Sequence, residues 1–314
     1  MSSEGFPVLV IAGPTAVGKS LTADYLARAL DAPVLSADAM QVYRGMDIGT
    51  AKTPVSERLV PLLLTDIVEP TESYSAALYQ NDARTLIDHM RSCKQHVVMC
   101  GGTGLYINAV LDAMEFPSGE IDDVRRAHYQ QLAIKLGTQG IYEYLVDRDP
   151  RSAAVIHPNN TRRVIRALEM LDEGIHYSDQ LEAFGEISEY YPSMRFSLCM
   201  ERSRLYERID ARVDTMIQQG LVDEVEQLAR DGAKDSLTSR QAIGYKEIFD
   251  YLDGHSCLED AVALIKQRSR RYAKRQISWF KKDVRYTPVD MDEMNPQQAA
   301  KCIYDLYIRY GNRG

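Results

Sequence analysis

Short apolar runs alternate with helical patterns in the first third of the chain. Three runs, at residues 7–12, 33–36 and 96–100, are each followed by a turn and then by apolar residues at helical spacing. Strands that alternate with helices in this way form parallel βαβ units, whose helices cover both faces of one sheet. The pattern therefore predicts an α/β fold with a parallel sheet core flanked by helices. Residues 62–67 predict a further buried strand or a strand-like link.

The strand pattern stops in the middle of the chain. Helical periodicity replaces it over residues 124–136, 141–146 and 161–171. A helical block inside an α/β pattern is typical of an inserted domain. We therefore predict an all-helical insertion domain at residues 121–190, within a catalytic core formed by residues 1–120 and 191–314.

The last third of the chain returns to the core. Residues 195–200 follow a turn pattern at residues 190–193 and predict a strand that rejoins the sheet. Residues 203–282 then predict helices, and residues 284–289 predict a last strand. The carboxyl ends of such parallel strands define the edge at which open α/β sheets bind their ligands.

Composition places the chain among ordinary globular proteins. It has 314 residues, of which 45% are hydrophobic and 26% are charged. Its longest apolar runs are far shorter than the roughly 20 residues that cross a membrane. The N-terminal segment carries an acid instead of a basic region, which argues against a signal peptide. We therefore predict a cytoplasmic protein without a membrane span, and we expect a monomer.

Cysteine and charge patterns narrow the choice of ligands. The 5 cysteines are scattered and form no CxxC pair, so neither a zinc site nor structural disulfides are expected. The net charge of -8 argues against nucleic acid, because phosphate neutralisation needs a basic surface. Residues 262–286 are an exception, since their only acid is Asp283. Their nine cations are Lys266, Arg268, Arg270, Arg271, Lys274, Arg275, Lys281, Lys282 and Arg285.

A phosphate-binding loop, the P-loop, follows the first predicted strand. It fits the pattern GxxxxGK[ST] between a strand and a helix, as the motif requires. Its residues are Gly13, Pro14, Thr15, Ala16, Val17, Gly18, Lys19 and Ser20. In such a loop the backbone N–H groups and the helix N-terminus surround a phosphate, the lysine reaches the outer phosphate, and the serine can ligate Mg2+. The alternative is a strand-to-helix turn without a ligand, which this spacing disfavours.

The P-loop alone does not say what happens to the phosphates. In ATPases and GTPases an aspartate at the end of a second buried strand helps to hold the magnesium. Here the run at residues 96–100 leads into Gly101, Gly102 and Thr103 without an acid, and Asp66 is the nearest substitute. A Gly-Gly-Thr turn offers N–H groups and a hydroxyl to a second phosphate contact, but paired glycines equally indicate close packing.

Asp38 follows the second predicted strand, at the ligand-binding edge of the sheet. Its position suits a catalytic carboxylate and a helix cap equally well. The wider sequence resembles the bacterial tRNA dimethylallyltransferases, also called tRNA isopentenyltransferases. The resemblance is specific because its blocks span nearly the whole chain in order. These blocks lie at residues 13–20, 36–52, 101–106, 157–169, 241–247 and 271–280.

The resemblance implies a P-loop NTPase-like core and a prenyl transfer reaction. A dimethylallyl group would pass from dimethylallyl diphosphate to the exocyclic N6 amine of the adenosine at tRNA position 37, next to the anticodon. The P-loop would then hold the leaving diphosphate instead of a nucleotide, and Mg2+ on Ser20 would neutralise its charge. The implied partners are dimethylallyl diphosphate and the anticodon stem-loop of tRNA.

The resemblance also implies roles for single residues. Asp38 matches the family's general base, which takes the amine proton once the target base is flipped out of its stack. Thr103 matches the threonine that binds the diphosphate from the far side. Arg212 matches the arginine that completes the cradle, where a planar guanidinium suits a diphosphate. Without the resemblance, a solvated helix arginine is the better explanation of Arg212.

Four segments match regions of the family that contact tRNA. They are Asp38, Ala39, Met40 and Gln41; Arg162, Arg163, Val164, Ile165 and Arg166; Gln241, Ala242, Ile243, Gly244, Tyr245 and Lys246; and Lys274, Arg275, Gln276, Trp279 and Lys281. In the basic stretch, cations recur every four residues and would form two adjoining stripes on a helix. We expect these cations to bind tRNA, whereas for Trp279 burial is favoured over stacking on RNA.

Two positions depart from the family pattern. Ala39 stands where a serine is usual, so a hydroxyl contact to the target nucleotide is lost there. Leucines at residues 62–64 replace a usual pair of histidines. The second change puts any role of those histidines in doubt but leaves the core chemistry unaffected.

Three other classes of protein share part of this pattern. A P-loop kinase acting on small molecules has the same loop but leaves the basic stretch unexplained. An isopentenyltransferase that acts on free adenylate shares the donor but needs neither the insertion nor the basic stretch. An RNA-binding protein without catalytic activity has no use for the P-loop.

Overall fold

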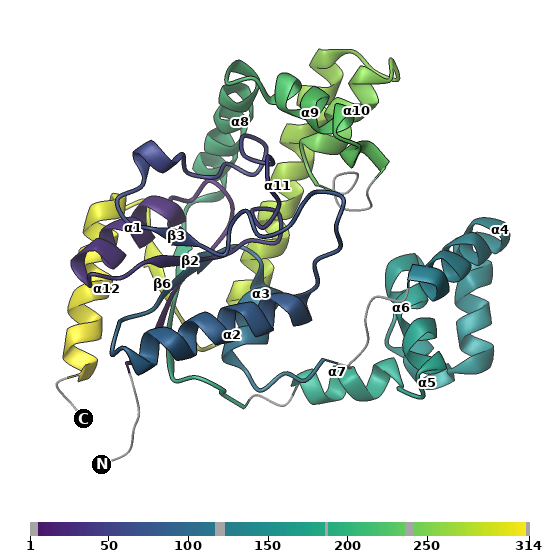
Figure 1. Cartoon of the computed structure of the whole chain (residues 1–314), viewed down its shortest axis with the longest axis horizontal. Coiled ribbons are helices and arrows are strands. Elements are labelled where there is room, and N and C mark those ends of the chain that lie inside the picture. The colour runs from purple at the N-terminus through teal and green to yellow at the C-terminus, as the bar shows by residue number, and fades with distance from the viewer. Residues whose placement is uncertain (1–5, 117–122, 186–187, 236–241, 312–314) are drawn as a thin grey trace. The chain divides into compact units, whose positions relative to one another are not determined.

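The computed structural model of the chain describes residues 6–116, 123–185, 188–235 and 242–311 (Figure 1). The chain divides into two compact units, which we call the core unit, residues 1–111 with 190–314, and the insertion unit, residues 112–189. Among the described residues, no helix combines the length and the apolar character that a membrane span requires.

Within the described residues, six parallel strands form the sheet of the core unit, in the order β3, β2, β4, β1, β5, β6. They are β1 Val8–Ala12, β2 Val34–Ala37, β3 Leu62–Leu63, β4 Val98–Gly101, β5 Ser193–Cys199 and β6 Tyr286–Asp290. Because Ala12 of β1 and Ala37 of β2 both pair with Gly101 of β4, the segments that follow these three strands leave the sheet side by side. This edge carries the P-loop, Asp38 and the Gly-Gly-Thr turn.

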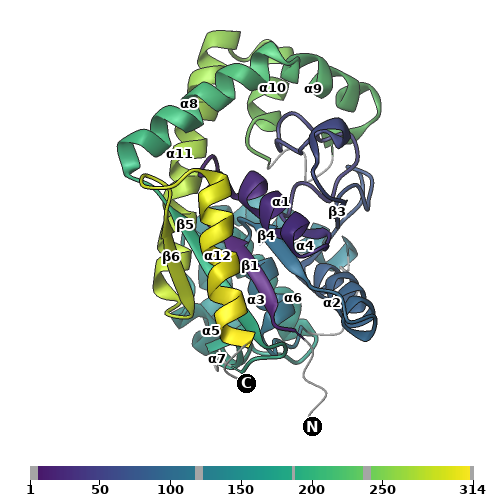
Figure 2. The same cartoon turned by 90° about the vertical axis from the view of Figure 1, so that its left-hand side faces the viewer.

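Helices cover both faces of the sheet. Helices α1 Lys19–Ala29 and α12 Pro296–Gly311 pack on one face, and Figure 2 shows α12 in front of β1. Helices α2 Ala76–Ser92 and α3 Gly104–Leu111 pack on the other face. Alternate residues of a strand point to opposite faces, and all of β1 is buried, as expected for a strand covered on both sides.

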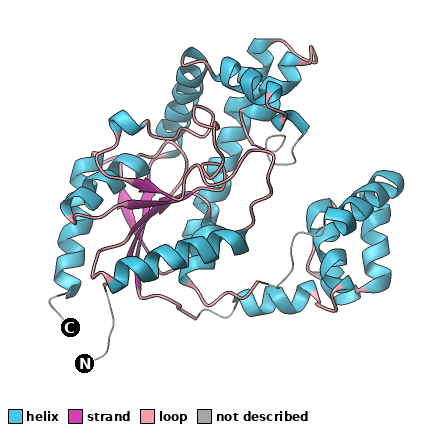
Figure 3. Cartoon of the chain, in the orientation of Figure 1, coloured by secondary structure: helices cyan, strands magenta, loops and turns pink. Residues whose placement is uncertain are grey.

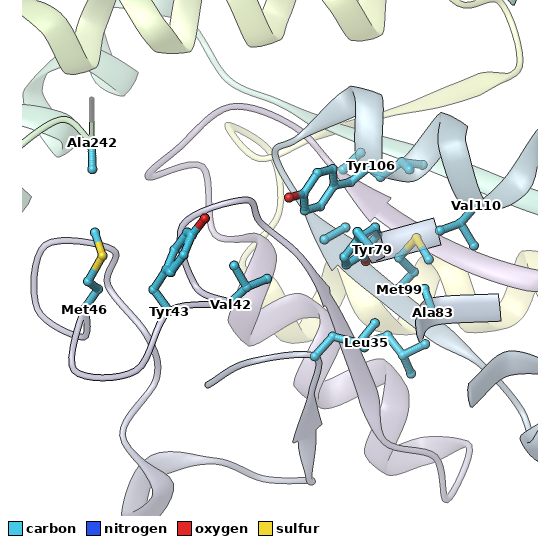
Figure 4. Packing of buried hydrophobic residues seen from close by; sticks show 14 of the residues in the cluster. Leu35, Val42, Tyr43, Met46, Tyr79, Ala83, Met99, Tyr106, Val110 and Ala242 are labelled. Carbon is cyan, nitrogen blue, oxygen red and sulfur yellow. The ribbon is translucent and has the colours of Figure 1, made fainter. Parts of the chain in front are cut away.

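The second face holds an aromatic cluster close to the ligand-binding edge (Figure 4). The rings of Tyr79 on α2 and Tyr106 on α3 stack with their centroids 4.1 Å apart. The Tyr79 hydroxyl donates to the carbonyl oxygen of Ser36 in β2 over 2.8 Å. This buried phenol therefore ties α2 to the strand that delivers Asp38.

Four more helices of the core unit lie in the part of the chain that the structure describes. They are α8 Arg202–Gln218, α9 Leu221–Arg230, α10 Tyr245–Leu252 and α11 Leu258–Lys282, with short 3-10 turns at Val55–Glu57 and Ala233–Asp235. Helix α11 packs on α3, α8 and α10. Its buried side chains recur on one face of the helix, as in an amphipathic helix that covers a core. They are Ala261, Ile265, Ala273, Gln276 and Phe280.

The insertion unit consists of helices and loops in the residues that the structure describes (Figure 3). The helices are α4 Asp123–Arg148, α5 Pro150–Ala154, α6 Thr161–Asp172 and α7 Tyr177–Gly185. Their core contains Tyr129, Ile141, Val164 and Leu168. Helix α4 is interrupted at Gly137, whose φ of 70° and ψ of 175° are not helical. This interruption explains why the sequence predicts two separate helices here.

The predicted fold class, an α/β fold with a parallel sheet, is confirmed. The apolar runs at residues 7–12, 33–36 and 96–100 correspond to β1, β2 and β4, and the two later runs correspond to β5 and β6. The link at residues 62–67 contains only a short strand, Leu62–Leu63. Leu64 and Asp66 have positive φ values of 62° and 57°, which end the extended conformation.

The close approach of β2 and β4 generates a stability prediction. A Cβ atom on Gly101 would lie 2.1 Å from the backbone oxygen of Ala37, in a paired strand that cannot move aside. We therefore expect Gly101→Ala to lower the free energy of unfolding by about 3 kcal/mol. Urea unfolding followed by circular dichroism would measure it.

Gly254→Ala is the matched control for this experiment. No atom lies within 4 Å of a Cβ added there, and only the φ of 76° opposes a side chain. The expected loss is about 1 kcal/mol. Equal losses of unfolding free energy in the two variants would show that the close contact between β2 and β4 adds no cost to Gly101→Ala.

Candidate active site

A cavity of about 360 Å³ lies at the carboxyl edge of the sheet. It is lined from the P-loop, the loop after β2, the turn after β4, and helices α8, α10 and α11. Lys19, Asp38, Thr103 and Arg212, which the sequence predicts as site residues, all line it. The parallel sheet thus brings distant parts of the chain into one site.

The P-loop curls tightly between β1 and α1. Gly13, Ala16 and Gly18 have φ values of 142°, 64° and 109°, which direct the backbone around the loop. The Lys19 ammonium donates to the carbonyl oxygen of Pro14 over 2.7 Å, within the same loop. Burial lowers the pKa of Lys19 to about 8. A phosphate bound in this loop would raise that pKa again, because a neighbouring anion favours the charged form of the lysine.

Gln276 on α11 connects the P-loop to the turn after β4. Its Oε1 accepts the N–H of Thr15 over 2.9 Å, and its Nε2 donates to the carbonyl oxygen of Gly102 over 3.0 Å. The side chain fits because Gly102 has no Cβ, since an added one would lie 2.1 Å from Nε2. The resemblance assigns Gln276 to tRNA binding. In the structure its side chain is only 5% exposed and links two loops of the protein.

Thr103 and Asp38 follow the carboxyl ends of the paired strands β4 and β2, and both line the cavity. The Thr103 hydroxyl accepts the N–H of Ala39 over 3.0 Å. Asp38 Oδ1 accepts the N–H of Met40 over 2.9 Å, so this carboxylate caps a tight turn and not a helix. The described residues provide no hydrogen bond to Asp38 Oδ2. One oxygen is therefore fixed by the backbone while the other is available to a ligand.

Arg212 on α8 contacts the P-loop. Its guanidinium donates to the Thr15 hydroxyl over 3.1 Å. Burial lowers the pKa of Arg212, and the charge of Asp38 acts in the opposite direction. Arg212 is half-buried and lines the cavity, so a fully solvated helix arginine does not describe it. Arg208, one helical turn earlier, donates to the carbonyl oxygen of Ala16 over 2.9 Å. Sequence reasoning missed Arg208, although its spacing of four residues from Arg212 places both on one helix face.

Two other groups near the cavity do not supply acids or nucleophiles. Asp66, the substitute for a strand-end acid, accepts from the buried Lys52 ammonium over 2.5 Å. Burial raises the pKa of the Cys100 thiol to about 12, so this thiol stays neutral. Among the described residues, no group of three or more His, Cys, Asp or Glu side chains is arranged to hold a metal ion.

The exposed Ser20 hydroxyl also lines the cavity, at the start of α1. Magnesium prefers an octahedron of oxygens and is often bound by one or two protein oxygens, the phosphates of the substrate and water. A single hydroxyl beside a phosphate loop fits this mode of binding. Ser20 could therefore hold Mg2+ together with a bound diphosphate.

The segment before α10 forms another part of the cavity wall. Ala242, Ile243, Gly244 and Tyr245 line the cavity, and Lys246 is exposed. Ala39, Met40 and Gln41 line it from the loop after β2. Gln241 lies outside the described residues. Arg275 and Gln276 line it from α11. Three of the four segments that the resemblance assigns to tRNA thus meet at this cavity.

Acids neutralise part of the basic stretch on α11. Lys266 pairs with Asp214, Arg268 with Glu247, Arg270 with Asp210, and Arg285 with Asp283. The remaining five cations have no ion pair with a described residue and are exposed, namely Arg271, Lys274, Arg275, Lys281 and Lys282. The basic stretch therefore presents fewer unpaired cations at the surface than its nine lysines and arginines suggest. The exposed cations recur three, four and seven residues apart and form one stripe.

Trp279 is 43% exposed, so the predicted burial of this side chain is wrong. A Cβ on Gly104 would lie 2.0 Å from its indole nitrogen, so the ring rests directly on the glycine backbone. The close packing expected of the paired glycines is present at Gly101 and Gly102, and Gly104 is packed just as closely. Thr103 between them lines the cavity.

The basic cluster of the insertion unit opens α6. Arg162 and Arg163 are exposed, and Arg166 lies 3.5 Å from Glu169. Val164 is fully buried in the core of the unit and Ile165 is partly buried against it. Within this segment only the arginines therefore present side chains that can reach a phosphate backbone.

Comparison with known proteins gives a consistent result. A family model described as IPP transferase matches residues 41–283. The chain is 44% identical over 301 residues to the tRNA dimethylallyltransferase of Halalkalibacterium halodurans, an alignment that covers 95% of this chain and 96% of the relative. It is 44% identical over 299 residues to the tRNA dimethylallyltransferase of Bacillus subtilis, with 93% and 95% covered.

Two solved structures share the fold. The full-length tRNA isopentenylpyrophosphate transferase of Bacillus halodurans has a TM-score of 0.69 and 42% identity, over 96% of this chain and 95% of that one. A eukaryotic dimethylallyltransferase described as acting on tRNA has a TM-score of 0.72 and 30% identity, over 91% of this chain and 74% of that one. Both similarities extend over most of the chain.

The lowered pKa of Lys19 predicts how ligand affinity depends on pH. The protonated lysine attracts a diphosphate, and this form dominates below a pKa of about 8. We therefore expect the affinity for dimethylallyl diphosphate to be level just below that pH, where the diphosphate is still fully ionised, and to fall by up to about tenfold per pH unit above it. Isothermal titration calorimetry without tRNA would measure this profile.

Lys19→Arg is the control, because an arginine stays charged at every pH that the protein tolerates. Its affinity should not decline in the same range, even if the longer side chain binds more weakly overall. A decline that is equally steep in both proteins would assign the titration to a group other than Lys19.

Proposed function

The chain belongs to the IPP transferase family, and we propose that it transfers a dimethylallyl group from dimethylallyl diphosphate to the N6 amine of adenosine at tRNA position 37. The observation that carries this proposal is the composition of the cavity. A phosphate loop, a guanidinium and a hydroxyl line the same cavity as a carboxylate that has one oxygen available. The cavity thus combines a site for a leaving diphosphate with a base for an amine proton.

The diphosphate would bind across the mouth of the P-loop. Backbone N–H groups and the N-terminus of α1 would hold one phosphate, and Lys19 would exchange its bond to Pro14 for a phosphate oxygen. Arg212 and Thr103 approach from α8 and from the turn after β4, so they would hold the diphosphate from the other sides. These fixed donors stabilise the charge that develops as the diphosphate departs.

The amine would react at the opposite wall of the cavity. Its nitrogen attacks C1 of the dimethylallyl group, the bond between C1 and the diphosphate oxygen breaks, and Asp38 accepts the proton that the amine loses. Asp38 can do this because one of its oxygens is fixed by the N–H of Met40 while the other has no bond to a described residue. Both products then leave without a covalent enzyme intermediate.

Mg2+ would be held by the Ser20 hydroxyl and by oxygens of the diphosphate. When bound, the ion neutralises charge on the leaving group. The protein supplies the remaining positive charge through Lys19 and Arg212. The absence of an acid at the end of β4 fits this arrangement, since nothing there competes with the diphosphate for the cations.

The tRNA would lie against the exposed stripe of α11. Five cations without acidic partners suit a phosphate backbone, and Trp279 beside them offers a ring face to a base. Arg162, Arg163 and Arg166 of the insertion unit suit the same ligand. As the sequence predicts, we expect the enzyme to act as a monomer in the cytoplasm.

A labelling experiment tests the proposed function. The protein is incubated with dimethylallyl diphosphate labelled in the prenyl group, or with ATP labelled in the terminal phosphate. Unmodified tRNA, free AMP or no acceptor is added to each donor. We expect label in tRNA only, and only from the prenyl donor. Phosphoryl transfer from ATP, or prenyl label on AMP alone, would refute the proposal.

The role of Asp38 gives a second prediction. Asp38→Asn keeps the size of the side chain and removes the base, so we expect kcat for tRNA prenylation to fall by about a thousandfold. Binding of tRNA, measured by filter retention, should change little. Asp31→Asn is the control, because Asp31 is exposed at the end of α1 and does not line the cavity. Near-normal turnover in Asp38→Asn would remove Asp38 as the base.

A further inference from the structure

A single carboxylate joins the two walls of the cavity that the resemblance assigns to tRNA. Glu224 lies on α9, and its carboxylate accepts the backbone N–H groups of three consecutive residues in the loop after β2. The donors are Asp47, Ile48 and Gly49, at 3.1, 2.7 and 3.2 Å. The Tyr245 hydroxyl donates to the same carboxylate over 2.7 Å. Four donors from two segments therefore converge on one side chain.

The three N–H groups belong to the start of a turn. The turn closes through the N–H of Ala51 to the carbonyl oxygen of Ile48 and the N–H of Lys52 to that of Asp47. The first N–H groups of such a turn have no acceptor within it, as at the start of a helix. A carboxylate satisfies several of them at once through charge-assisted hydrogen bonds. Glu224 therefore acts as a cap that is supplied by another part of the chain.

Tyr245 closes the same junction by packing. A Cβ on Gly49 would lie 2.4 Å from its ring, so the ring rests on the backbone of the turn. Tyr245 is fully buried and begins α10, and it lines the cavity together with Ala242 and Gly244. The clamp formed by Glu224 and Tyr245 thus fixes the start of α10 against the turn.

The clamp also reaches the segment that contains Asp38. The Gln41 amide donates to the carbonyl oxygen of Thr50 over 3.2 Å, directly after the clamped residues. Gln41 is also bonded to Ser36 at the end of β2 over 2.8 Å. The other side of the turn is secured by Lys52, whose ammonium binds Asp47 and Asp66. Asp38 itself is held by the N–H of Met40 and does not depend on Glu224.

We propose that Glu224 is a positioning residue that sets the distance between the two walls holding the target nucleotide, the loop after β2 and the start of α10. The inference rests on the proposed function, because it assigns these walls to tRNA, which accepts the prenyl group, and not to dimethylallyl diphosphate, which supplies it. Glu224 touches neither the P-loop nor Arg212, so the diphosphate site is independent of it. Weakening the clamp should therefore affect the use of tRNA and spare the binding of dimethylallyl diphosphate.

Glu224→Gln is the test variant, because it keeps the size of the side chain while replacing one acceptor oxygen by a donor that faces other donors. We expect kcat/KM for tRNA, at saturating dimethylallyl diphosphate, to fall at least tenfold. Calorimetric affinity for dimethylallyl diphosphate should stay within twofold of wild type. Tyr245→Phe removes one of the four hydrogen bonds and keeps the ring on Gly49, so its loss should be smaller. The effects of the two changes should not add, because they remove a shared interaction.

Two neighbours on α9 provide the controls. Glu226→Gln makes the same change at an exposed carboxylate that has no bond to a described residue, and it should leave kcat/KM unchanged. Val225→Ala creates a cavity in the buried core beside the clamp. It shows how far kcat/KM falls when stability is lost and the clamp is kept. Thermal unfolding measures the stability of each variant, so that losses of kcat/KM can be compared at equal stability.

The outcomes separate this inference from the proposed function. An active wild type with near-normal kcat/KM in Glu224→Gln would overturn the inference only. A loss in Glu224→Gln no larger than that in Val225→Ala at equal stability would assign Glu224 a purely structural role and also overturn it. A wild type that transfers no prenyl group to tRNA would refute the proposed function and the inference together.

Discussion

The contact between helix α11 and the turn after β4 is the constraint on which the site depends. Three loops that leave the carboxyl edge of the sheet, after β1, β2 and β4, form the site, and loops at such an edge have no sheet partners to hold them. Gln276 gives two of them a common anchor, because its amide binds Thr15 of the P-loop and Gly102 of the turn. Thr103 then anchors the third loop through the N–H of Ala39. The phosphate site and the base are thereby held in one frame before any ligand binds.

The sequence was sufficient to predict the fold because the strands are short and fully buried. Continuous apolar runs such as Val8–Ala12 lie between turn residues, and this pattern is typical of a parallel sheet with helices on both faces. Three consecutive leucines at residues 62–64 favour a longer strand than β3, which ends at Leu63 because Leu64 and Asp66 adopt positive φ values. The two helices predicted at residues 124–136 and 141–146 are separated at Gly137, whose φ and ψ are not helical, so the sequence pattern marks this break correctly.

The parts of the site that follow a motif could be predicted, and the parts that depend on long-range contacts could not. The P-loop has fixed spacing, and Asp38, Thr103 and Arg212 lie within blocks that resemble one family. Glu224 and Arg208 belong to no such spacing, and the backbone groups that they bind lie 175 to 177 and 192 residues away along the chain. The surface charge of α11 was overestimated for the same reason. The acids that neutralise Arg268 and Arg270 lie on α10 and α8, where the sequence gives no sign of the pairing.

The glycines of the turn after β4 also restrict how this protein can evolve. Gly102 and Gly104 have no room for a side chain, because Gln276 and the Trp279 ring occupy the space that a Cβ would need. A larger residue on the turn is tolerable only with a smaller residue on α11, and the reverse change is constrained in the same way. A larger residue at either glycine, introduced alone, would therefore clash with α11 and destabilise the turn. Related enzymes should preserve these two pairs of residues or exchange them together, which makes the pairs a record of shared descent.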